Sequence, residues 1–342
     1  MLVQTAQGTA PDGLPYHVFT LSNSNGMSIQ IMDWGATWIA CQVPVQTELR
    51  EVLVGCKLED YPFQDAYLGA TVGRYANRIA GSDFHLNGKQ ISLKANQGVH
   101  HLHGGMVGFD KQRWCVGQCS ENAVSFMLFS PDGDQGFQGN VEVVVTYTLT
   151  EDNCVELVFD AISDKDTPLN LTNHAYFNLV NAEQGVDIRS HFLCLHADYY
   201  LPVDKEGIPN APLKCVQQTS FDFRTEKKLA QDFLQDEQIA VNGYDHAFLL
   251  NKQQDVPCAI LTAPDRRLQL QMFTSQPALQ VYTGNFLAGT PRRHGGVYQN
   301  YAGIALESQA LPDTPNHQEW WSLGGMSQAN EKYHHWTKFK FL

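Results

Sequence analysis

Two ionisable residues lie in strand-like stretches that carry almost no other charge. Residues 169–179 read LNLTNHAYFNL and contain His174, while Glu307 is the single charged residue in GIALES. A glutamate in such a run either points to solvent or occupies a site of low dielectric, where a raised pKa suits a general base. Gly303 and Ala305 share the face of Glu307 at a period of two residues, and their small size would leave room for a ligand.

The stretch around His174 alternates between apolar and polar residues, which is typical of a half-buried strand. Its polar face consists of Asn170, Thr172, His174, Tyr176 and Asn178. These side chains form hydrogen bonds but carry little charge, unlike the Lys and Glu of an ordinary solvent-facing strand. The face is either an ordinary solvent-exposed surface or the floor of a site for a ligand rich in hydroxyl groups.

Two glycine-containing loops carry clusters of basic side chains. In GATVGRYANRIAG, Arg74 and Arg78 either bind an anion or pair with the chain's own carboxylates, and the pattern alone favours pairing. HHLHGGMVGFD at 100–110 has three histidines, but no Asp, Glu or Cys has a recognisable ligand spacing, so a metal site is disfavoured. Its double glycine indicates a tight turn or a close approach to a ligand. Asp245, in NGYDHAFLL, reads on pattern alone as a turn or cap residue.

Together, a histidine, a glutamate, an arginine, an aspartate and several amides could line a sugar site. The sequence contains no nucleophile elbow, no phosphate-binding loop and no dinucleotide fingerprint.

The composition limits the class of partner and the compartment. The net charge of −13 argues against a nucleic-acid partner and against an anionic membrane surface. Residues 1–20 lack the features of a signal peptide, and no apolar run approaches the length of about 20 residues that spans a bilayer. We expect the eight cysteines to be reduced and mostly buried, as in a cytoplasmic protein.

Short strand-like runs recur along the chain between Gly, Pro, Asn and Asp. The expected strands include 29–32, 123–129, 141–149, 155–159, 267–273 and 279–282. Helical periodicity is scarce, and 225–240 is the best candidate for one or two short helices. The pattern predicts an all-β fold, a large antiparallel β-sandwich that forms one domain over 1–342. A β-propeller is the alternative, but it should have repeats of blade length.

Seven segments in this order resemble the aldose 1-epimerases, or galactose mutarotases. They are GRYANRIAG, LHGG followed by GFDK and W, NLTNHAYFNL, YLPVD with GIP, GYDHAFLL, YTGNFL and GIALESQALPDTPNH. The resemblance covers nearly the whole chain. It implies a galactose mutarotase-like supersandwich with a few short helices, in which an open cleft on one concave sheet binds the sugar.

The resemblance also implies roles for individual residues. Glu307 matches the general base and His174 the general acid, which should stay protonated near neutrality. The residues that match the sugar-binding positions, or line the site, are Asn77, Arg78, His103, Tyr176, Asp245 and Gln280. The implied reaction interconverts the α and β anomers of a free aldohexose such as D-galactose or D-glucose, with no metal and no cofactor.

Three other functions remain as alternatives. A hexose-6-phosphate 1-epimerase would need further cations to bind the phosphate, for which Arg74, Arg292 and Arg293 are available. A non-catalytic sugar-binding module on the same fold would not need the His–Glu pair. A glycoside hydrolase could use Asp245 and Glu307 but leaves the histidine unexplained. The expected partner is a monosaccharide, with no nucleic acid or membrane, and the expected state is a monomer or weak homodimer.

Overall fold

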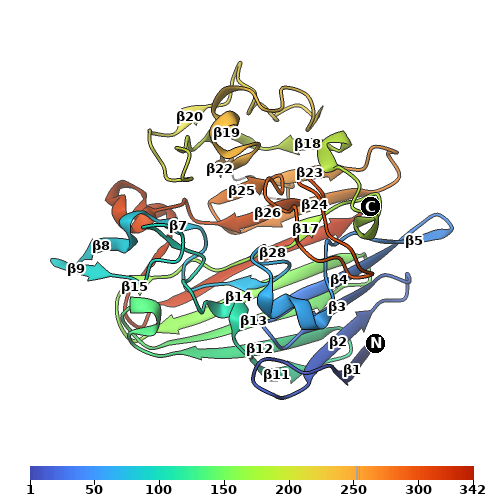
Figure 1. Ribbon diagram of the computed structural model, residues 1–342, viewed down its shortest axis with the longest axis horizontal. Coiled ribbons are helices and arrows are strands. Elements are labelled where there is room, and N and C mark those ends of the chain that lie inside the picture. The colour runs from blue at the N-terminus through green and yellow to red at the C-terminus, as the bar shows by residue number, and fades with distance from the viewer. Residues whose placement is uncertain (252, 254) are drawn as a thin grey trace.

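The computed structural model describes residues 1–251, 253 and 255–342, and β-strands dominate it (Figure 1). The largest sheet has nine antiparallel strands and runs from β11 at the bottom of Figure 1 toward β18 near the top. In spatial order these strands are β11 (Cys115–Cys119), β12 (Ala123–Ser130), β13 (Val141–Leu149), β14 (Cys154–Ser163), β28 (Lys332–Phe341), β24 (Gln269–Thr274), β23 (Ala259–Thr262), β18 (Phe192–Leu195) and β21 (Lys227–Lys228).

Two further antiparallel sheets pack against this one. The six-stranded sheet comprises β17 (Tyr176–Phe177), β26 (Ile304–Gln309), β25 (Ala278–Tyr282), β22 (Asp245–Leu250), β19 (Ala197–Tyr200) and β20 (Lys214–Cys215). The five-stranded N-terminal sheet comprises β1 (Leu2–Gln7), β2 (Tyr16–Ser22), β3 (Ser28–Met32), β4 (Thr37–Val45) and β5 (Glu48–Glu51). Short two-stranded pairs complete the fold: β6 (Thr71–Val72) with β16 (Thr172–Asn173), β7 (Arg78–Ile79) with β10 (His101–Leu102), β8 (Asp83–Leu86) with β9 (Lys89–Ser92), and β15 (Thr167–Pro168) with β27 (Met326–Ser327).

The core lies between the nine-stranded sheet and the other two sheets. A single cluster of buried apolar residues includes Ile31 of β3, Val145 of β13, Phe248 of β22 and Leu306 of β26. The strands alternate as expected, since β13 buries every second residue from Val141 to Leu149. The predicted all-β fold is confirmed. That residues 1–342 form one domain remains a prediction, with which this shared core is consistent.

The expected strands overlap β3, β12, β13, β14, β24 and β25, although β24 begins two residues after the expected 267–273, and 141–149 matches β13 at both ends. The helix predicted over 225–240 is wrong except at its end. Lys227–Lys228 pairs with β18 as β21, and Asp232 and Leu234 take positive φ angles, which interrupt a helix. The helical segments of the described chain are 3₁₀ turns: Leu58–Phe63, Ala80–Ser82, Phe109–Lys111, Asp134–Gly136, Ala182–Gln184, Ile188–Ser190, Asp236–Val241, Thr314–Asn316 and Gln318–Leu323.

The half-buried strand predicted over 169–179 is also wrong. The chain forms two short strands here, β16 and β17, and every residue from 169 to 179 is buried. β16 pairs with β6, whereas β17 pairs with β26. The strand therefore breaks where the chain changes partner, at His174 and Ala175. The asparagines bond to backbone groups: the Asn170 side-chain amide, for example, donates to the Ala76 carbonyl.

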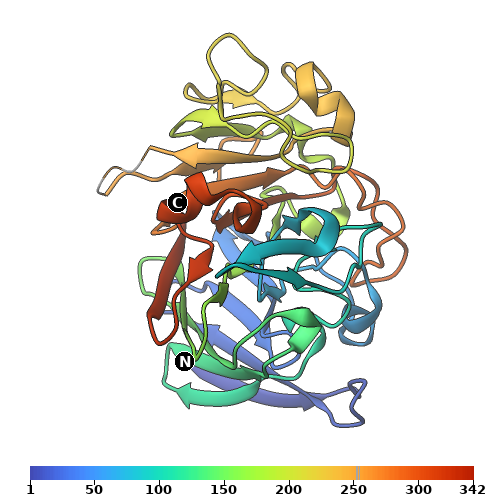
Figure 2. The ribbon, with the colours of Figure 1, turned by 90° about the vertical axis from the view of Figure 1, so that its left-hand side faces the viewer.

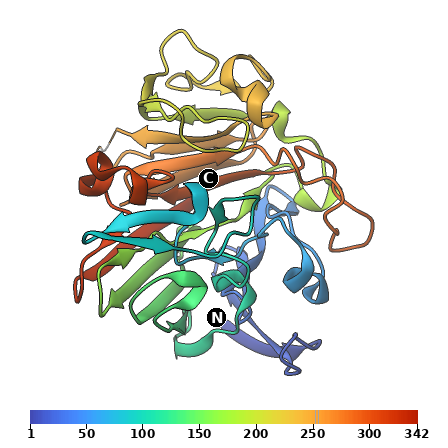
Figure 3. The ribbon, with the colours of Figure 1, turned by 60° about the vertical axis from the view of Figure 1, so that its left-hand side comes forward.

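Residues 75–105 and 310–325 are far apart in sequence but lie side by side, cyan to teal beside red in Figures 2 and 3. The Asp313 N–H donates to the Arg78 carbonyl at 2.9 Å, and the Asp313 carboxylate accepts from the Ala80 N–H. This contact ties β7, which contains Arg78, to the segment that follows β26.

The cysteines are all free thiols, as expected, but only half of them are buried. Cys41, Cys56, Cys154 and Cys258 are buried, whereas Cys115, Cys119 and Cys215 are exposed and Cys194 is intermediate. The exposed ones lie on β11 and β20, the edge strands of their sheets, where one face is open.

The described residues contain no helix with the length and apolar character that a membrane-spanning helix needs.

Candidate active site

Neighbouring strands of the six-stranded sheet present acidic and amide side chains on one face. Successive residues of a strand point to opposite faces, so Leu279 and Leu306 join the core while Gln280 and Glu307 point the other way. Gln280 lies directly opposite Glu307 in the β25–β26 pair. The Gln280 amide donates to Asp245 Oδ1 at 2.6 Å, which links the side chains of β25 and β22.

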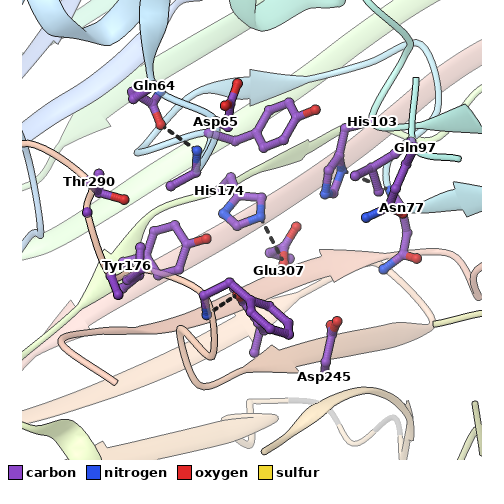
Figure 4. Close-up of a pocket in the computed structure, with 18 of the residues that line it drawn as sticks. Gln64, Asp65, Asn77, Gln97, His103, His174, Tyr176, Asp245, Thr290 and Glu307 are labelled. Carbon is purple, nitrogen blue, oxygen red and sulfur yellow. Dashed lines mark hydrogen bonds and ion pairs between the residues drawn. The ribbon is translucent and has the colours of Figure 1, made fainter. Parts of the chain in front are cut away.

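His174 reaches this face from the bend between β16 and β17. The backbone N–H of His174 donates to the Ala70 carbonyl, and the backbone carbonyl of His174 accepts from the Gly69 N–H. These two bonds hold the backbone of His174 in place. The Nε2 atom of His174 lies 3.5 Å from Oε1 of Glu307, as the dashed line in Figure 4 marks. These two residues are 3% and 2% exposed, so the pair is largely shielded from water.

Asn77 and His103 flank the paired strands β7 and β10 and lie to the right of His174 in Figure 4, on the side away from Tyr176. The Asn77 N–H donates to Nδ1 of His103 at 3.1 Å. Because Nδ1 accepts a hydrogen bond, the neutral ring carries its proton on Nε2. Burial, together with the charge of Arg78, holds the pKa of His103 well below its usual range. His103 is therefore a neutral hydrogen-bond donor through Nε2.

Arg78 lies at the edge of the site between two acceptors. Its Nε atom donates to Oε1 of Gln97 at 2.7 Å, and its Nη1 atom lies 3.9 Å from Oδ2 of Asp245. Gly207, at a φ of 78°, packs against the guanidinium, and a Cβ there would lie 2.7 Å from its Cζ atom. Gln97 and Gly207 thus fix the orientation of the arginine, and sequence reasoning missed both.

Replacing Gln97 with leucine is expected to raise KM for the sugar about tenfold, with a smaller change in kcat. The reason is that Arg78 loses the hydrogen bond that directs its guanidinium, while His174 and Glu307 stay in place. Initial rates at several sugar concentrations measure both constants. Gln97→Glu is the matched control, because it keeps an acceptor for Arg78 Nε, and its KM should stay close to wild type. An unchanged KM in Gln97→Leu would contradict this role.

Aromatic rings cover the remaining wall. Tyr176, which was predicted, has its ring centroid 4.9 Å from that of His174. Tyr67 and Tyr282 also face His174, at 5.9 and 6.5 Å, and sequence reasoning assigned neither. Tyr282 could have been found, because it shares the face of Gln280 at a period of two on β25. Tyr67 lies in a loop with no periodicity, so the sequence carries no signal for it.

These side chains enclose a cavity of about 740 Å³, within the range of small-molecule sites. Of the predicted site residues, the cavity wall contains Asn77, Arg78, His103, His174, Tyr176, Asp245 and Glu307. Gln280 lies behind the wall and contacts it through Asp245. Phe63 and Phe286 also line the cavity and are largely exposed to solvent, so the site is open.

Burial opposes charge on both members of the central pair. It lowers the pKa of His174 to about 4 and, with the nearby charge of Asp245, holds the pKa of Glu307 well above its usual range. In the empty site, the lowered pKa of His174 runs against the expectation that this residue stays protonated near neutrality. Both shifts favour the uncharged forms of the pair, imidazole and carboxylic acid, because these avoid burying two charges.

His103, His174 and Glu307 have the composition of a metal centre, because one ligand atom from each lies within 4.8 Å of the others. A histidine binds a metal through a ring nitrogen that carries no proton. The hydrogen bond from Asn77 instead leaves the proton of His103 on Nε2. The donor set therefore fits a site for a polar ligand better than a site for a cation.

Several other sequence candidates lie away from the cavity. Arg74 is buried and donates to carbonyl oxygens of Ser130, Pro131 and Gln138, so it neither binds an anion nor pairs with a carboxylate. His101 is buried and its ring bonds to the Lys94 carbonyl. A Cβ on Gly104 would overlap the Gly73 carbonyl, so the double glycine allows two backbone segments, not a ligand, to approach.

The space beside Gly303 and Ala305 is also filled by protein. A Cβ on Gly303 would meet Val54 and Tyr176, and Ala305 pairs with Tyr176 in the sheet. The expectation that these small residues leave room for a ligand is wrong. They make room for the tyrosine that packs beside His174.

A sequence model of the family described as aldose 1-epimerase matches residues 17–340. The chain belongs to the aldose 1-epimerase family. An aldose 1-epimerase of Haemophilus influenzae is 61% identical over 341 residues, which cover 100% of both chains. An aldose 1-epimerase of Escherichia coli is 48% identical and covers 97% of both. Among solved structures, an aldose epimerase homologue from C. elegans has a TM-score of 0.88 at 26% identity and covers 96% of this chain and 99% of its own.

Similarity of this degree over the full length makes the chain an aldose 1-epimerase, which is an isomerase of carbohydrate metabolism. The solved relatives have the galactose mutarotase-like fold that the resemblance implied. For an aldose 1-epimerase, an open cavity lined by amides, tyrosines and an uncharged histidine is chemically appropriate, since a sugar offers hydroxyl groups and no net charge.

Proposed function

We propose that this aldose 1-epimerase interconverts the α and β anomers of free aldohexoses such as D-galactose and D-glucose by opening and closing the sugar ring. The observation that carries the proposal is the approach of His174 Nε2 to within 3.5 Å of Glu307 Oε1 at the base of the cavity. One acid and one base are what the reaction needs. Each can contribute roughly 10²–10⁴-fold to the rate.

In the proposed reaction, Glu307 as carboxylate takes the proton of the C1 hydroxyl, and His174 gives a proton to the ring oxygen. The electron pair of the O1–H bond forms the C1=O1 carbonyl, and the C1–O5 bond breaks with its electrons on O5. Rotation about C1–C2 then turns the other face of the aldehyde toward O5. The same steps in reverse close the ring, with acid and base exchanging roles.

The uncharged state of the pair that burial favours is consistent with this chemistry. The neutral form, with imidazole and carboxylic acid, contains the same number of protons as the reactive form, with imidazolium and carboxylate. Moving one proton between the two side chains therefore generates both catalysts without exchange with solvent. Hydrogen bonds from a bound sugar would stabilise the charged form, because they replace the water that burial removed.

The remaining polar groups have the chemistry to orient the sugar. Nε2–H of His103 and the guanidinium of Arg78 can donate to sugar oxygens, and Asp245 can accept from sugar hydroxyls. A donor near O1 would also stabilise the negative charge that develops on O1, both when the ring opens and when it closes again. Asn77 supports the site through the tautomer of His103.

The rate is expected to depend on pH through both members of the pair. As the pH falls toward the pKa of about 4 that burial gives His174, the pair takes up a second proton and the base is lost. As the pH rises past the elevated pKa of Glu307, the pair loses its proton and the acid is lost. A plot of kcat/KM against pH should therefore be bell-shaped, with its acid limb near pH 4 and its alkaline limb well above the usual range of a glutamate. A single limb centred near 6.5, the ordinary pKa of histidine, would contradict this description.

The alternatives are less well supported. Arg78 is the only lysine or arginine among the described residues that line the cavity, and it already faces Asp245, so a phosphate dianion has little to bind it. Arg292 and Arg293 instead contact Glu183. A hydrolase would leave His174 unexplained, and a binding module would leave the whole His174–Glu307 pair unexplained.

Polarimetry tests the proposed function. Pure α-D-galactose is dissolved with and without the protein, and the optical rotation is followed to equilibrium. Faster decay to the same final rotation is expected. An unchanged decay with galactose and with α-D-glucose would contradict activity on free hexoses, and D-galactose 6-phosphate would then be the next substrate. That the enzyme works in the cytoplasm as a monomer or weak homodimer remains a prediction.

A further inference from the structure

Aromatic rings surround the imidazole of His174. The ring of Tyr67 lies at 5.9 Å from it with an angle of 24° between the planes, and the ring of Tyr176 lies at 4.9 Å with an angle of 36°. Both tyrosines therefore present their π faces to the imidazole more nearly than their edges. Tyr282 completes the set in an edge-on contact at 6.5 Å. The face of an aromatic ring attracts a cation, most strongly where water is excluded.

The positive charge that His174 carries when it protonates a sugar has little other support. Histidines that act as cations commonly donate their second N–H to a carboxylate or carbonyl. Nδ1 of His174 is buried and has no hydrogen-bond partner among the described residues. The groups that face the ring are Glu307 from β26, His103 after β10, Tyr176 from β17, Tyr282 from β25 and Tyr67.

Of these groups only Glu307 can supply a negative charge near neutrality, and in the proposed reaction it changes its own charge at the same time. His103 is held neutral, and Arg78 and Asp245 face each other. The charge of the tyrosines does not change during the reaction, because burial raises the pKa of both Tyr67 and Tyr176 above their usual range and keeps both hydroxyls protonated.

We propose that the π faces of Tyr67 and Tyr176 stabilise the imidazolium form of His174 and so favour the charged, reactive form of the His174–Glu307 pair. Tyr67 is then a positioning residue, because it acts on the reaction through the ring of His174, the proposed acid. This inference rests on the proposed function of His174. It assigns a role to Tyr67, which belongs to no motif of the sequence.

The test compares Tyr67→Phe, which keeps the π face, with Tyr67→Leu, which keeps apolar bulk without it. In Tyr67→Leu the plateau of kcat/KM should fall about 3- to 30-fold, and the acid limb of the pH profile should move about 0.5 to 1.5 units lower, because the imidazolium is less stable. Tyr67→Phe should keep the wild-type position of the acid limb. Far-UV circular dichroism at each pH, and the thermal midpoint of both variants, show whether they are folded.

Each outcome separates this inference from the proposed function. If the wild type accelerates mutarotation but the acid limb of Tyr67→Leu coincides with that of wild type, the π stabilisation is contradicted and the proposed function stands. A loss of rate in Tyr67→Leu without a shift of the limb indicates a merely structural role and also overturns the inference. A pH profile of Tyr67→Phe that matches the profile of Tyr67→Leu likewise overturns the inference. If Tyr67→Leu does not fold, Tyr67→Met replaces it in the same comparison.

Discussion

Replacing Glu307 with glutamine is expected to lower kcat by about 10³-fold or more, while the protein still binds D-galactose. Glutamine has the size of glutamate but cannot accept the C1 proton at neutral pH. The residue is buried and Oε2 has no hydrogen-bond partner among the described residues, so an amide NH₂ can take its position without displacing one. Polarimetry gives the rate, and saturation-transfer difference NMR with D-galactose shows whether the sugar still binds.

The matched control is Glu319→Gln, which makes the same chemical change at an exposed residue outside the cavity. Its rate should equal that of wild type. Turnover in Glu307→Gln within about tenfold of wild type would remove Glu307 as the base, since that is smaller than the usual contribution of such a group.

Replacing His174 with asparagine is expected to lower kcat by about 10²- to 10⁴-fold. Asparagine can still form hydrogen bonds but cannot deliver a proton to the ring oxygen. The backbone of residue 174 is held by Ala70 and Gly69 whatever the side chain, so the bend between β16 and β17 should persist. Initial rates at saturating sugar measure the change, and unchanged thermal unfolding would show that the fold is intact.

The control for this change is His294→Asn, because His294 is 72% exposed in its side chain and contacts Glu183 rather than the cavity. The double variant Glu307→Gln/His174→Asn adds a further test. Two residues that act as one unit are not additive, so the double variant should be little slower than the slower single variant. A normal rate in His174→Asn would mean that another group supplies the proton.

The strand pattern could be read from the sequence where a strand has one apolar face. β13 was predicted at both ends because each second residue is buried in one core. The same rule identified Glu307 as a charge in an apolar strand, although it could not say which face the side chain takes. That needs the register of β25 and β26, which places Gln280 opposite Glu307.

The surroundings of His174 could not be read from periodicity. The bend at 174 arises because the chain leaves β6 for β26, and a partner distant in sequence decides this. The helix predicted over 225–240 failed for the same reason, since β21 pairs with β18. The protonation of the pair depends on burial in three dimensions. Loop residues such as Tyr67 and Gln97 carry no pattern at all.

The resemblance to a family supplied what the pattern could not. It pointed to Asn77, His103 and Gln280, whose local sequences allow many interpretations. The structure adds how these residues are connected: Asn77 sets the tautomer of His103, and Gln280 holds Asp245. The catalytic and binding roles themselves remain proposals that the variants above test.

The most direct measurement follows α-D-galactose labelled with ¹³C at C1 and ¹⁸O at O1 by ¹³C NMR, with a catalytic amount of the protein. The two anomers have different C1 shifts, and the isotope shift shows whether ¹⁸O is still bound to C1. Opening of the ring breaks C1–O5 and leaves C1–O1 intact. We predict that the anomers equilibrate faster than without protein while the label is kept over many turnovers. Loss of ¹⁸O at the rate of anomer exchange, or no acceleration of exchange, would contradict the account.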